Sequence, residues 1–218
     1  MGSMIPSGDQ VLLRHGDHRA VVVEVGGGLR SYALGDWEVL DGYAESEQCS
    51  GGRGQALLPW PNRVRDGRYA FGGTEHQLAL TEPERHNALH GLARWVSWTV
   101  AARGPAHATL RHVLHPQQGW PFALELLVAY DLSGEGLRVT TTATNLGDEP
   151  CPYGAGWHPY LSVATERIDD ARLRAPGRLR AETDGQAIPV GDPLPVDGTR
   201  YDFRTPRAIG GVRLDTAY

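Results

Sequence analysis

Two histidine-bearing turns lie far apart in a chain that is otherwise rich in short β-prone segments. The first is Asn87-Ala88-Leu89-His90-Gly91 and the second is Gly156-Trp157-His158-Pro159-Tyr160. Glycine and proline interrupt regular structure, so each imidazole is presented from a loop or strand end, near Trp95 or Trp157. Histidine, with an ordinary pKa of ~6.5, holds or releases a proton near neutral pH. An imidazole beside a flat apolar ring favours a sugar pocket.

A rigid loop adds hydrogen-bond donors. In Pro59-Trp60-Pro61-Asn62-Arg63, two prolines fix the backbone around Trp60. Asn62 and Arg63 then present an amide and a guanidinium group, which match the hydroxyl oxygens of a sugar. From the loop alone, an arginine held in a surface salt bridge is an equally good interpretation.

Histidine spacing suggests metal binding only superficially. His86 and His90 are four residues apart, as in zinc-binding His-Glu-x-x-His helices, but the residues between them include no glutamate. Pro83 and Gly91 leave little room for a helix. The chain contains no lysine, which excludes Schiff-base catalysis and a P-loop lysine. It also has no Cys-x-x-Cys pair that could bind zinc. We predict neither a metal nor a cofactor.

Composition excludes some classes of partner. A net charge of -5 without a basic block argues against nucleic acid, which requires a concentrated positive surface. No apolar run approaches the ~20 residues that a membrane helix needs, so we expect no membrane partner. Two cysteines are too few for a disulfide scaffold and indicate a reduced, cytoplasmic location.

The periodicity predicts an all-β fold. Short β-rich runs occupy 20–25, 97–102, 123–130 and 137–144, and 133–136 has the composition of a hairpin turn. With 28 glycines and 15 prolines spread along the chain, this pattern is typical of a sandwich or barrel. We expect residues 1–218 to form a single domain.

The motifs, taken in order, resemble a known family. Leu58-Pro59-Trp60-Pro61-Asn62-Arg63, Asn87-Ala88-Leu89-His90-Gly91-Leu92 and Gly156-Trp157-His158-Pro159-Tyr160-Leu161 resemble the aldose 1-epimerases, also called galactose mutarotases. The resemblance runs from about Gly27 to Tyr218. It implies a β-supersandwich that binds a monosaccharide in a shallow groove. The implied reaction interconverts the α and β anomers of a free hexose without metal or cofactor.

The same resemblance implies roles for individual residues. His158 aligns with the general acid that protonates the ring oxygen, and His90 aligns with a histidine that hydrogen-bonds near that oxygen. Arg63 and Asp215 align with residues that hold sugar hydroxyls, and Asn62 is expected to assist them. Trp157 is expected to cover the apolar face of the sugar.

One catalytic group of the family has no counterpart. The general base of these enzymes is a glutamate in a motif near their C-terminus, and this chain ends at Tyr218 before such a motif. We therefore expect a fragment that lacks the last strands of the fold, and these 218 residues alone to be nearly inactive. Glu82 and Glu84 would be the first substitutes to consider, although acidic residues in a proline-containing loop are expected to be solvated.

Two other functions stay open from the sequence. A hexose-6-phosphate mutarotase would need an arginine cluster, to which Arg63, Arg65 and Arg94 could contribute. A non-catalytic sugar-binding or regulatory module would keep the groove and lack the base. We expect a monomer or a homodimer in each case.

Overall fold

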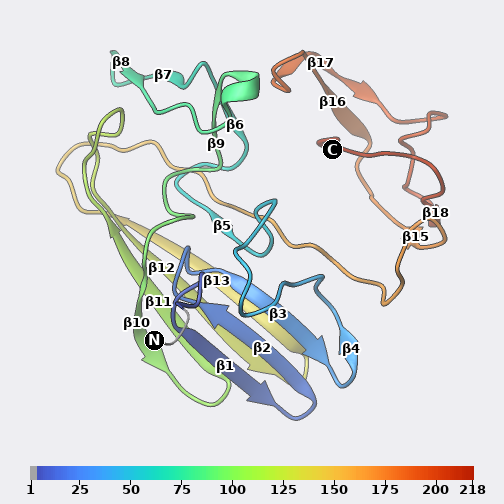
Figure 1. Cartoon of the computed structure of the whole chain (residues 1–218). Helices are drawn as coiled ribbons and strands as arrows, with labels where there is room; N and C mark the ends of the chain where they lie inside the picture. The colour runs from blue at the N-terminus through green and yellow to red at the C-terminus, as the bar shows by residue number, and fades with distance from the viewer. Residues whose placement is uncertain (1–3) are drawn as a thin grey trace.

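The computed structural model describes residues 4–218, and its regular structure is almost entirely strand (Figure 1). The first sheet has the strand order β1-β2-β3-β4 and the second has the order β10-β11-β12-β13. The strands of the first sheet are β1 (Gln10–His15), β2 (His18–Val23), β3 (Leu29–Leu34) and β4 (Trp37–Glu38). Those of the second are β10 (Thr99–Arg103), β11 (His107–Leu114), β12 (Leu124–Ser133) and β13 (Gly136–Asn145). This confirms the predicted all-β class.

The longest hairpin follows the sequence pattern closely. β12 and β13 pair antiparallel along ten residues each, and Ser133 pairs with Gly136 at the turn. Buried and less buried residues alternate along β12, because successive side chains of a strand point to opposite faces. The strand and turn expected at 123–144 are therefore confirmed to within a few residues.

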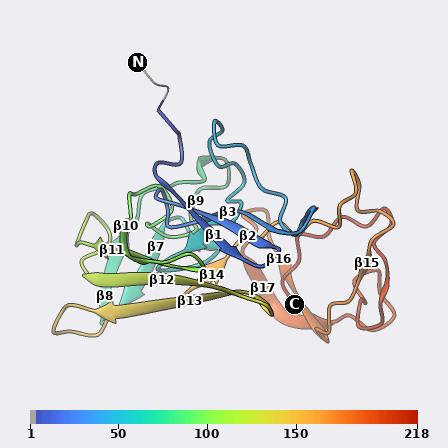
Figure 2. The same ribbon diagram turned by 90° about the horizontal axis from the view of Figure 1, so that it is seen from below.

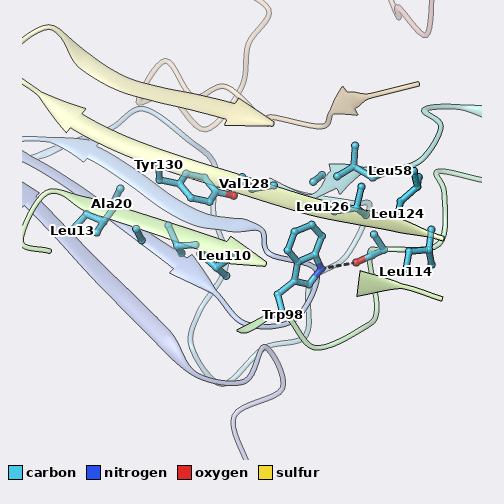
Figure 3. Packing of buried hydrophobic residues seen from close by; sticks show 14 of the residues in the cluster. Leu13, Ala20, Leu58, Trp98, Leu110, Leu114, Leu124, Leu126, Val128 and Tyr130 are labelled. Atoms are coloured by element: carbon cyan, nitrogen blue, oxygen red, sulfur yellow. Dashed lines mark hydrogen bonds between the residues drawn. The ribbon is translucent and has the colours of Figure 1, made fainter. Parts of the chain in front are cut away.

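The core fills the space between the two sheets, which Figure 2 shows as stacked layers. β12 contributes alternate apolar side chains, including Leu126 and Tyr130, and β1 and β2 contribute Leu13 and Ala20 from the facing sheet (Figure 3). Burying this apolar surface stabilises the sandwich by ~25 cal/mol per Å² removed from water.

Two buried aromatic side chains also satisfy their polar atoms. The Trp98 indole Nε1 donates to the carbonyl oxygen of Ala93 at 3.1 Å, and the Tyr130 hydroxyl donates to the carbonyl oxygen of Gly27 at 2.6 Å. A buried donor without an acceptor would cost ~1–3 kcal/mol of stability. These two bonds avoid that cost, and they hold the loops that contain Ala93 and Gly27 against the core.

Short strand pairs outside the two sheets carry the histidine-bearing turns. The pairs on that side are β5 (Ala56–Leu57) with β14 (Gly156–Trp157), β6 (Arg63–Arg65) with β9 (Asn87–Leu89), and β7 (Arg68–Phe71) with β8 (Thr74–Gln77). A single 3-10 turn, η1 (Pro83–Arg85), precedes β9. Ala56 of β5 and Ala88 of β9 belong to the core cluster, so these pairs hold the loops beside the sandwich.

The C-terminal residues 164–218 form a lobe beside the sandwich (Figures 1 and 2). Its strand pairs are β15 (Arg172–Leu173) with β18 (Arg207–Ala208), and β16 (Leu179–Thr183) with β17 (Pro189–Pro195). Val196 and Phe203 are fully buried within it. The part of the chain described here includes no helix with the length and apolar character needed to span a membrane.

Candidate functional site

The β5–β14 ladder positions His158. β14 pairs antiparallel with β5, and the ladder continues where the His158 backbone N–H donates to the Gln55 carbonyl oxygen at 3.2 Å. A side chain at Gly156 would lie 2.6 Å from the Cβ of Pro61, so glycine is required for the strand to pass this loop. His158 thus reaches the proline-rich loop although about 100 residues separate them.

Aromatic stacking fixes the orientation of the His158 ring. The ring lies 5.2 Å from that of Tyr160 with an interplanar angle of 23°, and the Arg53 guanidinium covers Tyr160 at 4.6 Å. Among residues 4–218, no hydrogen bond occupies the nitrogens of the His158 ring, which leaves them to interact with a ligand.

The β6–β9 pair positions His90. The His90 backbone N–H donates to the Asn62 carbonyl oxygen at 2.9 Å, and the Asn62 backbone N–H donates to His90 Nδ1 at 3.0 Å. Nδ1 is therefore an acceptor, and the proton of the neutral imidazole resides on Nε2. Both residues have positive φ angles, 60° at Asn62 and 62° at His90, which folds the two loops against each other.

The two histidine rings face each other. Their centroids are 5.5 Å apart and their planes are nearly perpendicular, at 83°. Burial, followed by the positive charges of Arg94, His158 and Arg63, lowers the pKa of His90 to about 4. His90 is consequently neutral above pH 5. It can donate a hydrogen bond through Nε2, but it carries no extra proton that it could transfer as an acid.

Arg63 lies beside this pair and is held by Glu82. Its Nε donates to Glu82 Oε2 at 2.8 Å and its Nη2 donates to Glu82 Oε1 at 2.9 Å. A third donor, Nη1, contacts the Asn62 side-chain oxygen at 3.1 Å. The expectation that Glu82 is solvated is wrong, because its side chain is only 4% exposed.

Two other predicted residues are placed differently from one another. Asp215 lies exposed in the C-terminal lobe, and its negative charge adds to the effect of the hydrogen bonds that Arg63 donates to Glu82 in raising the pKa of Arg63. The Trp157 indole instead packs on the core, perpendicular to Tyr130, and donates to Thr141 Oγ1 at 3.2 Å. Neighbouring residues of a strand point to opposite faces, so the half-buried Trp157 lies against the core while His158 points elsewhere. The contact of Trp157 with a sugar stays a prediction.

Sequence reasoning missed two buried residues of this site. Glu82 was weighed only as a substitute base, and Asn87 was named only as part of the His90 motif, although Asn87 is fully buried and donates to Glu82. The signal available in the sequence was Glu82 five residues before Asn87 and three residues before Arg85, a pattern that is also typical of a solvated turn. Only the fold shows that this turn is covered.

Comparison with known proteins now decides the family. The sequence model described as aldose 1-epimerase matches residues 9–218. The chain belongs to the aldose 1-epimerase family. It is 32% identical to the Escherichia coli protein YihR over 213 residues, which cover 97% of this chain and 69% of YihR. It is 27% identical to human galactose mutarotase over 177 residues, which cover 78% of this chain and 50% of the human protein.

Solved structures of the aldose 1-epimerase type share the fold. A GalM/aldose epimerase homologue from Caenorhabditis elegans superimposes with a TM-score of 0.83 at 18% identity and covers 92% of this chain and 65% of its own. Galactose 1-epimerase from Lactobacillus acidophilus superimposes with a TM-score of 0.76 at 23% identity, and the match covers 92% of this chain and 62% of the epimerase. This aldose 1-epimerase family member thus spans between half and about two thirds of the length of these relatives.

Proposed function

We propose that the protein interconverts the α and β anomers of a free hexose by acid–base ring opening, with His158 as the general acid. Membership of the aldose 1-epimerase family supports the reaction class. The observation that carries the proposal is the perpendicular pair of His90 and His158, 5.5 Å apart and beside Arg63. Human galactose mutarotase and Levilactobacillus brevis maltose epimerase, both relatives of this chain, support an aldose as the substrate class.

The reaction requires two proton transfers. A base takes the proton of the anomeric hydroxyl, the bond between C1 and the ring oxygen breaks, and an acid protonates that oxygen. The resulting aldehyde rotates about the C1–C2 bond and closes on its other face, which returns both protons. His158 donates to the ring oxygen in this scheme, while neutral His90 supports the same oxygen with its Nε2–H.

The remaining groups hold the sugar. A guanidinium has five N–H donors, and Glu82 and Asn62 use three of those of Arg63. The two that remain are assigned to sugar hydroxyls, with Asn62 Nδ2 and the Asp215 carboxylate as further ligands. Such contacts are made by the ground state and the transition state alike, so they act mainly on KM.

The base is assigned to none of the residues 4–218. Glu82 is closest to the histidines among the candidates considered, but hydrogen bonds from Arg63 hold its pKa at about 2 and make it a weak base. A chain of these 218 residues alone is therefore expected to bind sugar and to turn it over slowly.

Polarimetry tests the proposal directly. The optical rotation of freshly dissolved α-D-glucose and α-D-galactose is followed with and without the protein, and sugar binding is measured in parallel by calorimetry. A rate above the buffer background supports an enzyme. Binding without any acceleration would support a non-catalytic sugar-binding module instead, and the absence of both would overturn the proposal.

A second candidate is a mutarotase for a hexose that carries an anionic group such as a 6-phosphate. Arg63 and Arg65 are already paired with Glu82 and Asp184, so they do not form the phosphate cluster considered from the sequence. Arg94 is different, because within the described residues its side chain donates hydrogen bonds only to the Leu89 carbonyl oxygen at 3.3 Å and to Gln55 Oε1 at 3.5 Å, and its buried Nε has no acceptor. Its guanidinium also lies over the Trp95 ring, 5.7 Å from the centroid. A half-buried cation without a carboxylate partner favours an anionic ligand.

The two candidates differ in a measurable way. Glucose 6-phosphate binding more tightly than glucose, with the difference removed in Arg94→Gln, would favour the anionic substrate. Equal binding of both sugars would favour the free hexose.

A further inference from the structure

A cluster of buried polar side chains lies behind the proposed sugar site. At its centre is Glu82, whose carboxylate accepts four hydrogen bonds. Two come from Arg63, at 2.8 and 2.9 Å, one from Arg85 Nη1 at 3.1 Å and one from Asn87 Nδ2 at 3.0 Å. The pairing with Arg63 is bidentate, which fixes the plane of the guanidinium as well as its position.

The charge state of Glu82 excludes a role in proton transfer. An isolated carboxylate would be costly to bury, and here the hydrogen bonds from Arg63, Asn87 and Arg85 offset that cost and hold its pKa at about 2. Glu82 is thus ionised throughout the pH range in which a histidine can act as an acid. Its contribution to the site is therefore geometric.

Asn87 extends the cluster to the C-terminal lobe. Its Nδ2 donates both to Glu82 and to the backbone carbonyl oxygen of Gln186, at 2.8 Å, in the turn between β16 and β17. The side chain of Gln186 donates to Asp66 Oδ1, in the turn between β6 and β7, at 3.0 Å. The lobe that carries Asp215 is thereby tied to the strand pair that carries Arg63.

We infer that Glu82 is a positioning residue, which holds the Arg63 guanidinium so that its two remaining N–H groups face the sugar. This inference rests on the proposed sugar-binding function. Without the bidentate carboxylate, the Arg63 side chain has several alternative rotamers and a desolvated charge, so fewer of its conformations present donors to a hydroxyl. Glu82 touches neither sugar nor reacting atoms and acts only through Arg63.

The test is a double-mutant cycle on sugar binding and on the kinetic constants of the protein. Glu82→Gln keeps the shape of the side chain and removes the charge, and it is expected to raise KM and Kd ~10–100-fold, the usual worth of a hydrogen bond to a charged group. The value of kcat is expected to change less than KM. Arg63→Ala is expected to have an effect of similar size.

The combination of the two changes decides the mechanism. If Glu82 acts only through Arg63, adding Glu82→Gln to the Arg63→Ala protein changes KM and Kd less than about two-fold, because coupled residues are not additive. A further ten-fold loss in that background would overturn the inference. A merely structural role would lower thermal stability and shift kcat and KM together, and that result would overturn it as well.

Matched controls separate the failure of this inference from the failure of the function. Glu75→Gln makes the same substitution at an exposed position of β8 and is expected to leave KM unchanged. If Glu82→Gln does not fold, Glu82→Asp keeps the charge but is too short for both bonds to Arg63, and it must still raise Kd. A wild-type protein that binds sugar, together with an unaffected Glu82→Gln, overturns this inference alone, whereas a wild-type protein that binds no sugar overturns both.

Discussion

At the residue scale, the environment assigns different properties to the two histidines. His90 accepts a hydrogen bond from the Asn62 backbone at Nδ1 and is surrounded by Arg94, His158 and Arg63, so its neutral form is stabilised. His158 stacks on Tyr160 and leaves its ring nitrogens to a ligand. One histidine is thereby a fixed donor, and the other is the candidate for moving a proton.

The lowered pKa of His90 predicts a pH dependence of stability. The native pKa is about 4 and the ordinary value is 6.5, so between these pH values the unfolded chain binds a proton that the folded protein excludes. The free energy of unfolding therefore rises with pH across this window, by at most ~1.4 kcal/mol per pH unit from this group. Stability from His90 is complete above pH 6.5 and is lost as the pH falls toward 4.

His90→Asn isolates this contribution. The Asn side-chain oxygen takes the position of Nδ1, can accept from the Asn62 N–H, and tolerates the positive φ of 62°. Urea unfolding at pH 7 and pH 5 should show a larger loss of stability for the wild type than for this variant. Parallel pH profiles would contradict the assigned cause.

At the element scale, local pattern and long-range pairing differ in how much the sequence reveals. The β12–β13 hairpin was predictable because its alternation and its turn are local. The β5–β14 pair joins segments about 100 residues apart, and no periodicity in either two-residue strand indicates its partner. The packing of Trp157 on the core and the burial of Glu82 both depend on such long-range contacts, so sequence reasoning missed the first and was wrong about the second.

Gly91 tests how tightly the His90 turn is packed. Its φ is 76°, and a Cβ at this position would lie 2.0 Å from the carbonyl oxygen of Leu58. The clash is with backbone, so no side chain can move to relieve it. Gly91→Ala should lower the free energy of unfolding by at least ~2 kcal/mol in denaturant titrations. Gly104→Ala, where a Cβ meets no atom within 4 Å, is the control, and equal losses in the two variants would count against this packing.

At the scale of the whole molecule, two stacked sheets hold the loops that carry the site. The sequence predicted this sandwich from composition and alternation, and the family resemblance predicted that Arg63, His90, His158 and Asp215 contact one sugar. It could not predict that residues 164–218 form a lobe tied to the Arg63 strand through Asn87 and Gln186, because hydrogen bonds between polar side chains leave no periodic signature.

The core between the sheets should dominate stability. Leu126 is completely buried, so Leu126→Ala should cost ~2–5 kcal/mol of unfolding free energy through lost contacts and a residual cavity. Leu12, on β1 of the facing sheet, is 48% exposed, and Leu12→Ala should cost much less. A similar cost for both substitutions, measured by urea unfolding, would contradict the packing of the two sheets.

The central claim is that His158 donates the proton that opens the sugar ring. The measurement is the anomerisation rate of α-D-galactose, followed by polarimetry for the wild type, for His158→Asn and for the control His115→Asn, whose side chain lies exposed after β11. A general acid is worth ~10²–10⁴-fold in rate. The account therefore predicts that the slow rate of the wild type above the buffer background falls to that background in His158→Asn, with sugar affinity and circular dichroism unchanged, while His115→Asn keeps the wild-type rate. An active wild type and a His158→Asn protein with the same kcat would contradict it.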